Sequence, residues 1–422
     1  MTGQLTAVDL FSGAGGASLG VVQSGFDLRF AVEIDPHAAR THHENLPGIV
    51  LDTDIQRLDE RSFLGAAGVG VGELDLLFAG PPCQGFSMIG PRKISDLRNS
   101  LSREVLRATA VLRPKAVVIE NVPGLLTLAN GRYLASILSS LRTEGYQASC
   151  AELLAAQYGA PQMRWRLVII AWRDDLDIPA GFGFPRPTHG SAGIGELVSN
   201  STISDELYKG LLTTRVALGD LPVIQAGESL ETYGGRPRHE FQVAARTRFD
   251  GRRMRSGELY DHYAAALCPL TLERIRLLAP GQDWRDLPFE LLPPSMQRAL
   301  RKDHTRRYRR MTWDGVPRSI ITRFRDPKSG EYIHPEQNRT ISIREAARVQ
   351  GFPDWFAFSG PNTSKYTQVG NAVPVPLARE IASEVMACLT GIESRERLVD
   401  PFRRKPLALL DRHGQLVVGL AA

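Results

Sequence analysis

Residues 5–16 have the sequence LTAVDLFSGAGG, in which an apolar run leads into a glycine-rich turn. A helical pattern follows, so the segment predicts a strand, a tight turn and a helix in succession. In that arrangement a ligand can approach bare backbone amides at the start of the helix. A simple tight turn has the same composition. The segment therefore predicts the first part of an α/β fold, with a candidate ligand cradle in its turn.

Short apolar runs alternate with amphipathic stretches as far as residue 172. This alternation is typical of a mostly parallel sheet covered by helices, and it resembles a doubly wound, Rossmann-like α/β domain. Helices are expected at residues 101–112 and 133–141. The expected strands are residues 5–11, 28–34, 48–51, 74–78, 116–120, 147–153 and 166–172.

The texture of the sequence changes after residue 172. Residues 181–190 are rich in Gly and Pro and predict a linker, and an irregular, arginine-rich region follows. Helical patterns return at residues 342–350 and 375–389. We expect a first domain of residues 1–185 completed by 365–392, a second region of residues 190–340, a connecting helix and loop at 341–364, and a tail at 393–422.

Composition limits the class of protein. The chain has 422 residues and a formal net charge of +5, and most of the excess Lys and Arg lies in residues 191–340. A basic region favours a polyanionic partner, although a solvated charged face has the same composition. The four Cys form no CxxC motif, so the sequence predicts neither a metal site nor a disulfide framework. Without a secretory signal or a stretch approaching about 18 apolar residues, we expect a cytoplasmic protein with no membrane span.

Cys83 lies in the sequence GPPCQGFS at residues 80–87, directly after an expected strand. The carboxyl ends of strands are where open α/β sheets bind ligands. Two prolines stiffen this loop, and the flanking glycines let other groups approach closely. Cysteine is most often a small buried residue. In this loop Cys83 is instead a candidate nucleophile.

A candidate acid and candidate arginines lie at the same predicted edge. Glu120 ends an expected strand, where it could cap a helix, form a salt bridge, or protonate a ring nitrogen while a thiolate attacks the ring. The sequence QMRWR at residues 162–166 opens the last expected strand, and the period of two puts Gln162, Arg164 and Arg166 on one face. Such arginines suit a carbonyl, carboxylate or phosphate, or form a structural ion pair with Glu120.

Several acids follow the glycine-rich turn. Glu33 ends the second strand twenty residues after Gly13, as ribose-binding acids typically do. Asp35 precedes Pro36 and fits better as a helix N-cap, whereas Asp54 could face an adenine edge or cap a helix. The ring of Phe11 suits a ligand without phosphates, such as an adenosyl sulfonium, for which a cation–π contact is plausible.

These motifs together resemble the DNA (cytosine-5) methyltransferases, the family that makes 5-methylcytosine. The resemblance covers nearly the whole chain and keeps the family's order of motifs. It runs through the motifs already described and continues with RTISIREAAR at 339–348, QGFPD at 350–354 and QVGNAVP at 368–374. It implies a Rossmann-like fold of the kind that uses S-adenosylmethionine, with residues 1–185 and 365–392 forming the catalytic domain.

The resemblance also implies roles for individual residues. Cys83 would attack C6 of cytosine, Glu120 would contact N3 and the exocyclic amine, and Arg166, with Arg164 behind it, would hold the base carbonyl. The residues around S-adenosylmethionine would be Phe11, Ser12, Gly13, Gly15, Gly16, Glu33, Asp54, Pro82 and Asn371. Residues 342–349 would form a helix at the boundary between domains.

Double-stranded DNA is the implied partner, with residues 190–340 as the target-recognition region. The target base must leave the duplex because its C5 and C6 faces are stacked, and residues 87–99, glycine-bearing and basic, are predicted to close over it as a lid. The family's usual Thr-Leu or Thr-Ile pair is matched here by Ser319-Ile320. The candidate DNA contacts are Arg98, Arg301, Lys302, Arg306, Arg307, Arg309, Arg310 and Ser319, although the basic cluster could be a solvated helix face.

Three other functions are compatible with parts of the sequence. The tRNA-methylating branch of the family shares the catalytic motifs, but its Cys-Phe-Thr tripeptide does not occur here. A silent DNA-binding regulator would have lost the nucleophile or the acid, and a nucleotide hydroxymethylase would not need the long basic region. We expect a monomeric DNA (cytosine-5-)-methyltransferase (EC 2.1.1.37) that acts at a short specific sequence, as an orphan or beside a cognate restriction endonuclease.

Overall fold

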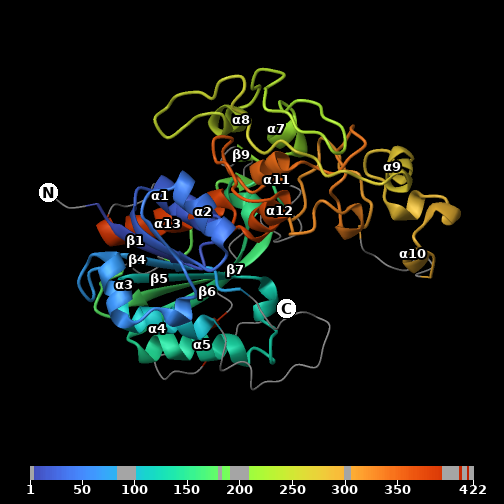
Figure 1. Cartoon of the computed structure of the whole chain (residues 1–422). Coiled ribbons are helices and arrows are strands. Elements are labelled where there is room, and N and C mark those ends of the chain that lie inside the picture. Colours follow the sequence, from blue (N-terminus) through green and yellow to red (C-terminus); the bar gives the residue numbers. More distant parts are fainter. Residues whose placement is uncertain are drawn as a thin grey trace. The chain divides into compact units, whose positions relative to one another are not determined.

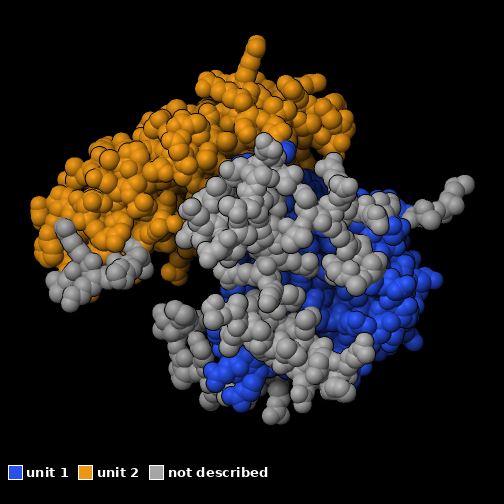
Figure 2. Space-filling view, turned by 180° about the vertical axis from the view of Figure 1, so that it is seen from behind, with its two compact units in different colours: residues 1–158, 165–210, 373–422 blue, residues 159–164, 211–372 orange. Residues whose placement is uncertain are grey.

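The computed structural model describes residues 4–82, 101–178, 183–190, 209–298, 306–391, 408–410 and 416–417. The chain forms two compact units, which Figure 2 shows in different colours. Unit 1 comprises Met1–Tyr158, Trp165–Gly210 and Val373–Ala422, and unit 2 comprises Gly159–Arg164 and Leu211–Ala372. Residues 365–372, expected to help complete the first domain, belong to unit 2, as does the connecting segment 341–364.

Within the described residues, unit 1 contains a nine-stranded sheet in the order β11-β10-β6-β7-β5-β4-β1-β2-β3 (Figure 1). Strands β1 to β5 are parallel to their neighbours among themselves, whereas β6, β7, β10 and β11 pair antiparallel. The bounds are β1 (Thr6–Leu10), β2 (Asp27–Glu33), β3 (Ile49–Asp52), β4 (Leu76–Ala79), β5 (Ala116–Asn121), β6 (Tyr146–Leu154), β7 (Trp165–Arg173), β10 (Ala408–Leu410) and β11 (Leu416–Val417). All the strands expected from the sequence are present within about two residues of their bounds, which confirms the predicted fold.

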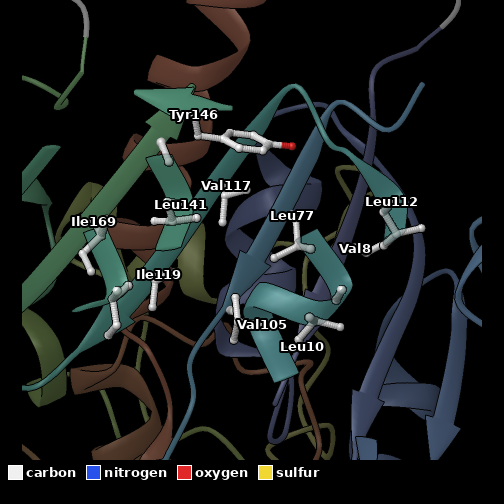
Figure 3. Close-up of a cluster of buried hydrophobic side chains, with 14 of the residues drawn as sticks. Val8, Leu10, Leu77, Val105, Leu112, Val117, Ile119, Leu141, Tyr146 and Ile169 are labelled. Carbon is white, nitrogen blue, oxygen red and sulfur yellow. The ribbon is translucent and has the colours of Figure 1, made fainter. Parts of the chain in front are cut away.

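Helices cover both faces of this sheet (Figure 1). On one face lie α1 (Gly16–Gln23), α2 (Pro36–Asn45) and α13 (Val375–Thr390), and on the other lie α3 (Glu60–Ala67), α4 (Ser102–Leu112) and α5 (Arg132–Thr143). Alternate strand residues such as Val8, Leu77 and Val117 pack against Val105 and Leu141 of α4 and α5 (Figure 3). Each such fully buried aliphatic side chain stabilises the fold by about 1.5–3 kcal/mol.

Short elements complete unit 1. They are the pair β8 (His189–Gly190) and β9 (Lys209–Gly210), and the 3₁₀ turns Ile55–Arg57, Pro123–Leu125 and Ala155–Tyr158. Strand β8 lies at the end of the predicted linker, residues 181–190, of which residues 181 and 182 lie outside the described residues. The backbone amide of Thr188 donates to the carbonyl of Gln157 (2.8 Å), so this part of the chain is fixed to unit 1.

Unit 2 has helices but little sheet. The described helices are α7 (Thr214–Leu218), α8 (Glu240–Ala245), α9 (Pro269–Arg276), α10 (Pro294–Arg298), α11 (Ile343–Val349) and α12 (Asn362–Asn371), with 3₁₀ turns at Trp284–Asp286, Phe289–Leu291 and Pro327–Ser329. The helix predicted at residues 342–350 is α11. Its N-cap is Ser342, which forms a capping box with Glu345.

Helix α11 is held by buried arginines. Arg348 is fully buried and pairs with Asp220 and with Asp354, whose Oδ2 lies 2.6 Å from Nη2. Arg339, also fully buried, donates from both terminal nitrogens to the Glu345 carboxylate at 2.7 Å. Removing one partner of such a pair leaves a buried charge and costs about 3–5 kcal/mol. These pairs fix α11 to segments distant in sequence, while a hydrophobic cluster that includes Trp284 and Ile333 packs elsewhere in unit 2.

The close contact of α1 with α13 generates a testable prediction. A Cβ on Gly20 would lie 2.6 Å from the backbone nitrogen of Arg379 and 2.7 Å from the Val375 oxygen. Because these are backbone atoms of α13, Gly20→Ala should destabilise unit 1 by about 1–3 kcal/mol. Urea unfolding monitored by circular dichroism measures this change.

Gly65→Ala is the matched control, since Gly65 also lies within a helix but a Cβ there meets nothing within 4 Å. That substitution should stabilise the protein by about 0.4–1 kcal/mol, because alanine restricts the unfolded chain. Equal effects at the two glycines would contradict the packing described for α1 and α13.

Candidate active site

The pairing register brings several chain segments to one edge of the sheet. In the parallel strands Leu10 pairs with both Val32 and Ala79, and Ala79 pairs with Ile119. The next residues along the chain are Phe11, Glu33, Gly80 and Glu120. Since the strands run parallel, these residues lie at the same level of the carboxyl edge, where open α/β sheets bind ligands.

The glycine turn, residues 11–16, has an unusual backbone. Phe11 has φ 60°, which non-glycine residues rarely adopt and which often marks a functional site. Gly15 has φ 99°, and a Cβ there would lie 2.9 Å from the ring of His42. A Cβ on Gly13 would meet nothing within 4 Å, so open space adjoins the turn. A turn with a free flank at a helix start fits a bound ligand.

Glu33 connects the turn to the end of β2. Its Oε2 accepts from the backbone amide of Gly13 (2.8 Å), and its Oε1 accepts from Asp35 (2.8 Å) and Ile34 (3.0 Å). Burial raises the pKa of this carboxyl above its ordinary value, and the three amides oppose that shift. The carboxylate is fixed at the turn, as a ribose-binding acid must be.

The neighbouring acids have different roles. Asp35 caps α2 by accepting from His37 (3.0 Å) and Ala38 (2.9 Å), which confirms its predicted role. Asp54 accepts from the amide of Gln56 (3.0 Å), so the capping alternative is present, and contact with an adenine edge stays a prediction. Sequence analysis missed Ile34, whose side chain is 64% exposed directly beside Glu33. Its signal was an apolar residue immediately after the ribose-binding candidate.

A buried polar chain lies beneath the turn, and the sequence analysis did not find it. Ser18 donates to Oδ2 of Asp9 (2.5 Å), and His42 Nε2 lies 2.8 Å from the Ser18 hydroxyl. Burial raises the pKa of Asp9 to about 7, partly opposed by the Ser18 hydrogen bonds, and burial lowers the pKa of His42 to about 4. Both side chains are therefore largely neutral near pH 6, which reduces the cost of burying them.

The Cys83 loop, residues 80–87, begins at this edge. The backbone amide of Gly80 donates to the Leu10 carbonyl (3.1 Å), and the Asn121 side chain donates to the Pro81 carbonyl (3.2 Å). Pro82 is exposed. Cys83 itself, Arg98 and the predicted lid at residues 87–99 lie outside the described residues. The loop is thus fixed by β1 and β5 up to the residues that directly precede the thiol.

Glu120 and Arg166 form an ion pair at this edge, with 2.6 Å between Oε1 and Nε. Their side chains are about one-tenth exposed, at 9% and 12% respectively. Arg166 also donates to the Trp165 carbonyl (2.8 Å). The salt bridge weighed as a structural alternative is therefore present. It also fixes the carboxylate that the catalytic alternative requires, so the two roles are compatible.

The expected common face of Gln162, Arg164 and Arg166 is wrong. Strand β7 begins at Trp165, so only Arg166 is a strand residue. Gln162 donates to the Val349 carbonyl (3.0 Å), and Arg164 donates to Ile320 (2.5 Å) and Gly370 (3.3 Å), all within unit 2. Hydrogen bonds to carbonyls distant in sequence hold Gln162 and Arg164 outside the strand. A pattern with a period of two does not predict such contacts.

The candidate DNA contacts in unit 2 differ in their availability. Glu331 lies 3.1 Å from Arg306 and 3.2 Å from Arg309, and Asp283 lies 3.6 Å from Arg309. The Ser319 hydroxyl donates to the Met163 carbonyl (3.0 Å), and Arg307 is partly buried. Arg301 and Lys302 lie outside the described residues, and exposed Asn371 ends α12 within unit 2.

The prediction that Arg310 contacts DNA is wrong, because Arg310 is buried and all its side-chain N–H groups donate within the protein. Its five hydrogen bonds go to Leu278 (2.6 Å), His334 (3.0 Å), Gln337 (3.1 Å), Ile275 (2.7 Å) and Asn338 (2.8 Å). No donor remains for a phosphate, so Arg310 is removed from the DNA-contact candidates.

Within the described ranges no group of three or more His, Cys, Asp or Glu could hold a metal ion. Among the helices that the structure describes, none combines the length and apolar character needed to cross a membrane.

Comparison with known proteins identifies the family. The profile of the C-5 cytosine-specific DNA methylases matches residues 5–387. The chain belongs to this family. It is therefore a DNA (cytosine-5-)-methyltransferase (EC 2.1.1.37), its methyl donor is S-adenosylmethionine, and its substrate is DNA.

Individual relatives match over most of their length. The chain is 30% identical to the type II methyltransferase M.AgeI of Thalassovita gelatinovora over 92% of this chain and 100% of that protein. It is 33% identical to M1.HphI of Haemophilus parahaemolyticus over 92% and 88%, respectively. A crystal structure of a DNA modification methyltransferase encoded in an E. coli prophage matches with TM-score 0.67 and 25% identity, covering 92% of this chain and 99% of the other.

The buried polar chain beneath the glycine turn gives a pH-dependent prediction for this methyltransferase. Burial raises the pKa of Asp9 from 3.8 to about 7, so between these values the folded protein binds more protons than the unfolded chain. The Asp9 contribution to stability must therefore fall as pH rises through this window. The free energy of unfolding of wild type, measured relative to Asp9→Asn, should fall by about 1–4 kcal/mol from pH 4 to pH 8.

Asp59→Asn is the control of opposite sign. Hydrogen bonds from Ser62 lower the pKa of Asp59, so its stabilisation is present at neutral pH and lost as pH falls below about 4. Urea titrations of the three proteins at several pH values measure both trends. A pH-independent difference for Asp9→Asn would contradict the neutral, buried state described for Asp9.

Proposed function

We propose that this methyltransferase acts on a flipped-out cytosine at a short specific sequence in double-stranded DNA, through a transient covalent bond between Cys83 and C6. The observation that supports this most strongly is the shared sheet edge. There the register aligns the glycine turn, Glu33, the start of the Cys83 loop and Glu120, and Arg166 pairs with Glu120 (2.6 Å).

The cofactor residues fit their ligand. Gly13 has open space in place of a side chain, and Glu33 is fixed by the amides of Gly13 and Asp35. We propose that Glu33 binds the ribose hydroxyls, that exposed Ile34 contacts the adenine ring, and that Phe11 lies near the sulfonium. Ser12, Gly15, Gly16, Asp54, Pro82 and Asn371 remain proposed members of this site. When bound, S-adenosylmethionine supplies an electrophilic methyl group to C5.

Cys83 solves a problem of reactivity. C5 of aromatic cytosine is a poor nucleophile, and adding a thiolate at C6 moves the ring electrons toward C5 and N3. A thiol with an ordinary pKa of about 8.5 is only about 3% ionised at pH 7. The loop that begins at Gly80 must therefore favour the thiolate, or proton transfer must accompany the attack. After C5 is methylated, loss of its proton restores the double bond as the C6–S bond breaks.

Glu120 and Arg166 act on the same ring. As attack proceeds, negative charge develops at N3 and O2, and a proton held by Glu120 can neutralise N3. Arg166 lies on β7 beside β5, and its guanidinium has donors that suit a ring carbonyl. The ion pair between them keeps both groups in place before the base arrives. Arg164, buried in unit 2, supports the segment that leads into β7.

The residues proposed to contact DNA come from several separate segments of the chain. The lid at residues 87–99, with Arg98, would close over the flipped base. Arg301, Lys302, Arg306, Arg307, Arg309 and Ser319 remain proposed backbone contacts. Because the relatives M.AgeI and M1.HphI are named type II methyltransferases, we propose that this enzyme protects sites from a cognate restriction endonuclease, and that it acts as a monomer.

Methyl transfer from labelled S-adenosylmethionine to duplex DNA, tRNA and free dCMP tests this proposal. We expect label only in duplex DNA, at C5 by bisulfite sequencing. Cys83→Ser should abolish transfer, and Glu120→Gln should lower kcat by about 10²–10⁴-fold because it removes a general acid.

Cys268→Ser and Glu73→Gln are the controls, since both residues are exposed and Glu73 precedes β4, at the opposite end of that strand from Gly80. They should retain wild-type rates. Label in tRNA alone, or undiminished transfer by Cys83→Ser, would overturn the proposal.

A further inference from the structure

Residues 246–255 form a tight hairpin after α8, which we call the arginine hairpin. Thr247 and Arg253 form an antiparallel bridge, and Met254 donates from its amide to the Arg246 carbonyl (2.8 Å). The turn is closed by the amide of Gly251, which donates to the Arg248 carbonyl (3.0 Å). Gly251 has φ 79°, a conformation that favours glycine. The sequence RTRFDGRRMR was not recognised as a unit from its pattern alone.

The base of the hairpin is anchored in unit 2. Arg246 is buried and pairs with Asp220, and Met254 is also buried. The indole of Trp355 donates to the Thr247 carbonyl (3.1 Å), and its ring lies 4.9 Å from the ring of Phe249. These contacts fix the hairpin before any partner binds. A surface fixed in this way loses little conformational entropy on binding.

The tip of the hairpin is basic and exposed. Arg252, Arg253 and Arg255 are exposed, and the guanidinium groups of Arg253 and Arg255 have no acidic partner among the described residues. The Arg255 backbone amide donates to the Glu258 carboxylate (2.6 Å). Arg252 pairs with Asp250, but both side chains remain open to solvent, at 78% and 45%. Such pairs contribute little and exchange readily with another anion.

A second pair of arginines lies on a segment that contacts Arg246. The Arg246 Nη1 donates to the Gly235 carbonyl (2.8 Å), and the Arg246 guanidinium lies 3.9 Å from the ring of Tyr233. Arg236 and Arg238, which follow, are exposed and have no acidic partner within the described ranges. The hairpin and this segment therefore form one surface on which four arginine side chains lack an acidic partner among the described residues. Arg248 differs, since its Nη2 lies 3.5 Å from Oε1 of Glu258.

The predicted basic cluster at residues 301–310 has fewer free guanidinium donors among its described residues than the hairpin surface. Arg306 and Arg309 share Glu331, and Arg310 is buried with no free donor. These three described arginines of the cluster thus have acidic or carbonyl partners within the protein. At the hairpin, Arg253 and Arg255 keep their guanidinium donors, and Phe249 is 56% exposed despite its contact with Trp355. Arginines beside an exposed aromatic ring are typical of a nucleic-acid surface.

We propose that the arginine hairpin, together with Arg236 and Arg238, binds the backbone of the duplex DNA substrate. The proposal rests on the activity of this chain toward duplex DNA. Guanidinium groups bind phosphate oxygens in pairs of hydrogen bonds, and a two-stranded ribbon is narrow enough to enter the major groove. Phe249 adds an apolar contact with sugars or base edges. The hairpin supplies affinity and salt dependence, which the sequence had assigned to residues 301–310.

Salt-dependent binding of the full-length chain to a fluorescent duplex tests the proposal. Each phosphate contact contributes about −0.9 to the slope of log K against log salt. Arg253→Gln combined with Arg255→Gln should make the slope shallower by about 2, with an unchanged melting temperature. Phe249→Ala should weaken binding about 5–10-fold without changing the slope, since it removes an apolar contact and no charge.

Two double variants serve as controls. Arg57→Gln with Arg61→Gln removes the same charge from exposed positions of unit 1 and should leave the slope unchanged. Arg306→Gln with Arg309→Gln tests the basic cluster and should change the slope by less than the hairpin variant. An unaltered slope for the hairpin variant, or an equal change in the unit 1 control, would overturn the proposal.

A parallel assay separates this inference from the proposed function. If wild type methylates duplex DNA but the hairpin variants keep the wild-type slope, the hairpin proposal fails alone. If wild type does not methylate duplex DNA, the proposed function fails first. Should the double variant melt below wild type, Arg255→Gln alone decides: it should make the slope shallower by about 1, and an unchanged slope would refute the proposal.

Discussion

The parallel register of β2, β1, β4 and β5 is the constraint on which the site depends. Leu10 pairs with Val32 and Ala79, and Ala79 pairs with Ile119. Because of this register, Glu33, the glycine turn, the Cys83 loop and Glu120 all begin at one level of the sheet. A shift of one residue in any strand would move all of its side chains to the opposite face of the sheet and displace the residue at its carboxyl end. The core that prevents such a shift includes Val8, Leu77 and Val117, so hydrophobic packing also fixes the geometry of the chemistry.

The two units differ in the polar groups that they bury. Unit 1 is held by aliphatic side chains between strands and helices, and burial keeps the chain of Asp9, Ser18 and His42 beneath its turn largely neutral near pH 6. Unit 2 has a hydrophobic cluster that includes Trp284 and Ile333, and it also buries arginines paired with acids, as at Arg348 and Arg339. Paired arginines organise irregular segments because each guanidinium can bind several groups at once. The same residue type at the arginine hairpin is left exposed, where it can bind an anion from outside.

Much of the fold could be predicted from the sequence because strand and helix patterns are local. The positions of the strands are predictable from short apolar runs, and the common edge of Glu120 and the start of the Cys83 loop follows from parallel strands alone. The roles of Gln162 and Arg164 could not be predicted, because their partners, such as Ile320 and Gly370, lie about 150–200 residues away in the chain. The burial of Arg310 could not be predicted for a different reason, since backbone carbonyls that accept from a buried guanidinium leave no sequence pattern.

The central claim is a sulfur–carbon bond between Cys83 and the target cytosine, and trapping that bond tests it most directly. A duplex with 5-fluorocytosine at the methylated position should remain attached to the enzyme in the presence of S-adenosylmethionine, because fluorine cannot leave C5 as a proton does. Digestion and mass spectrometry should then find the nucleotide on the peptide containing Cys83. Methylation of ordinary duplex DNA without any adduct at Cys83 would contradict the account.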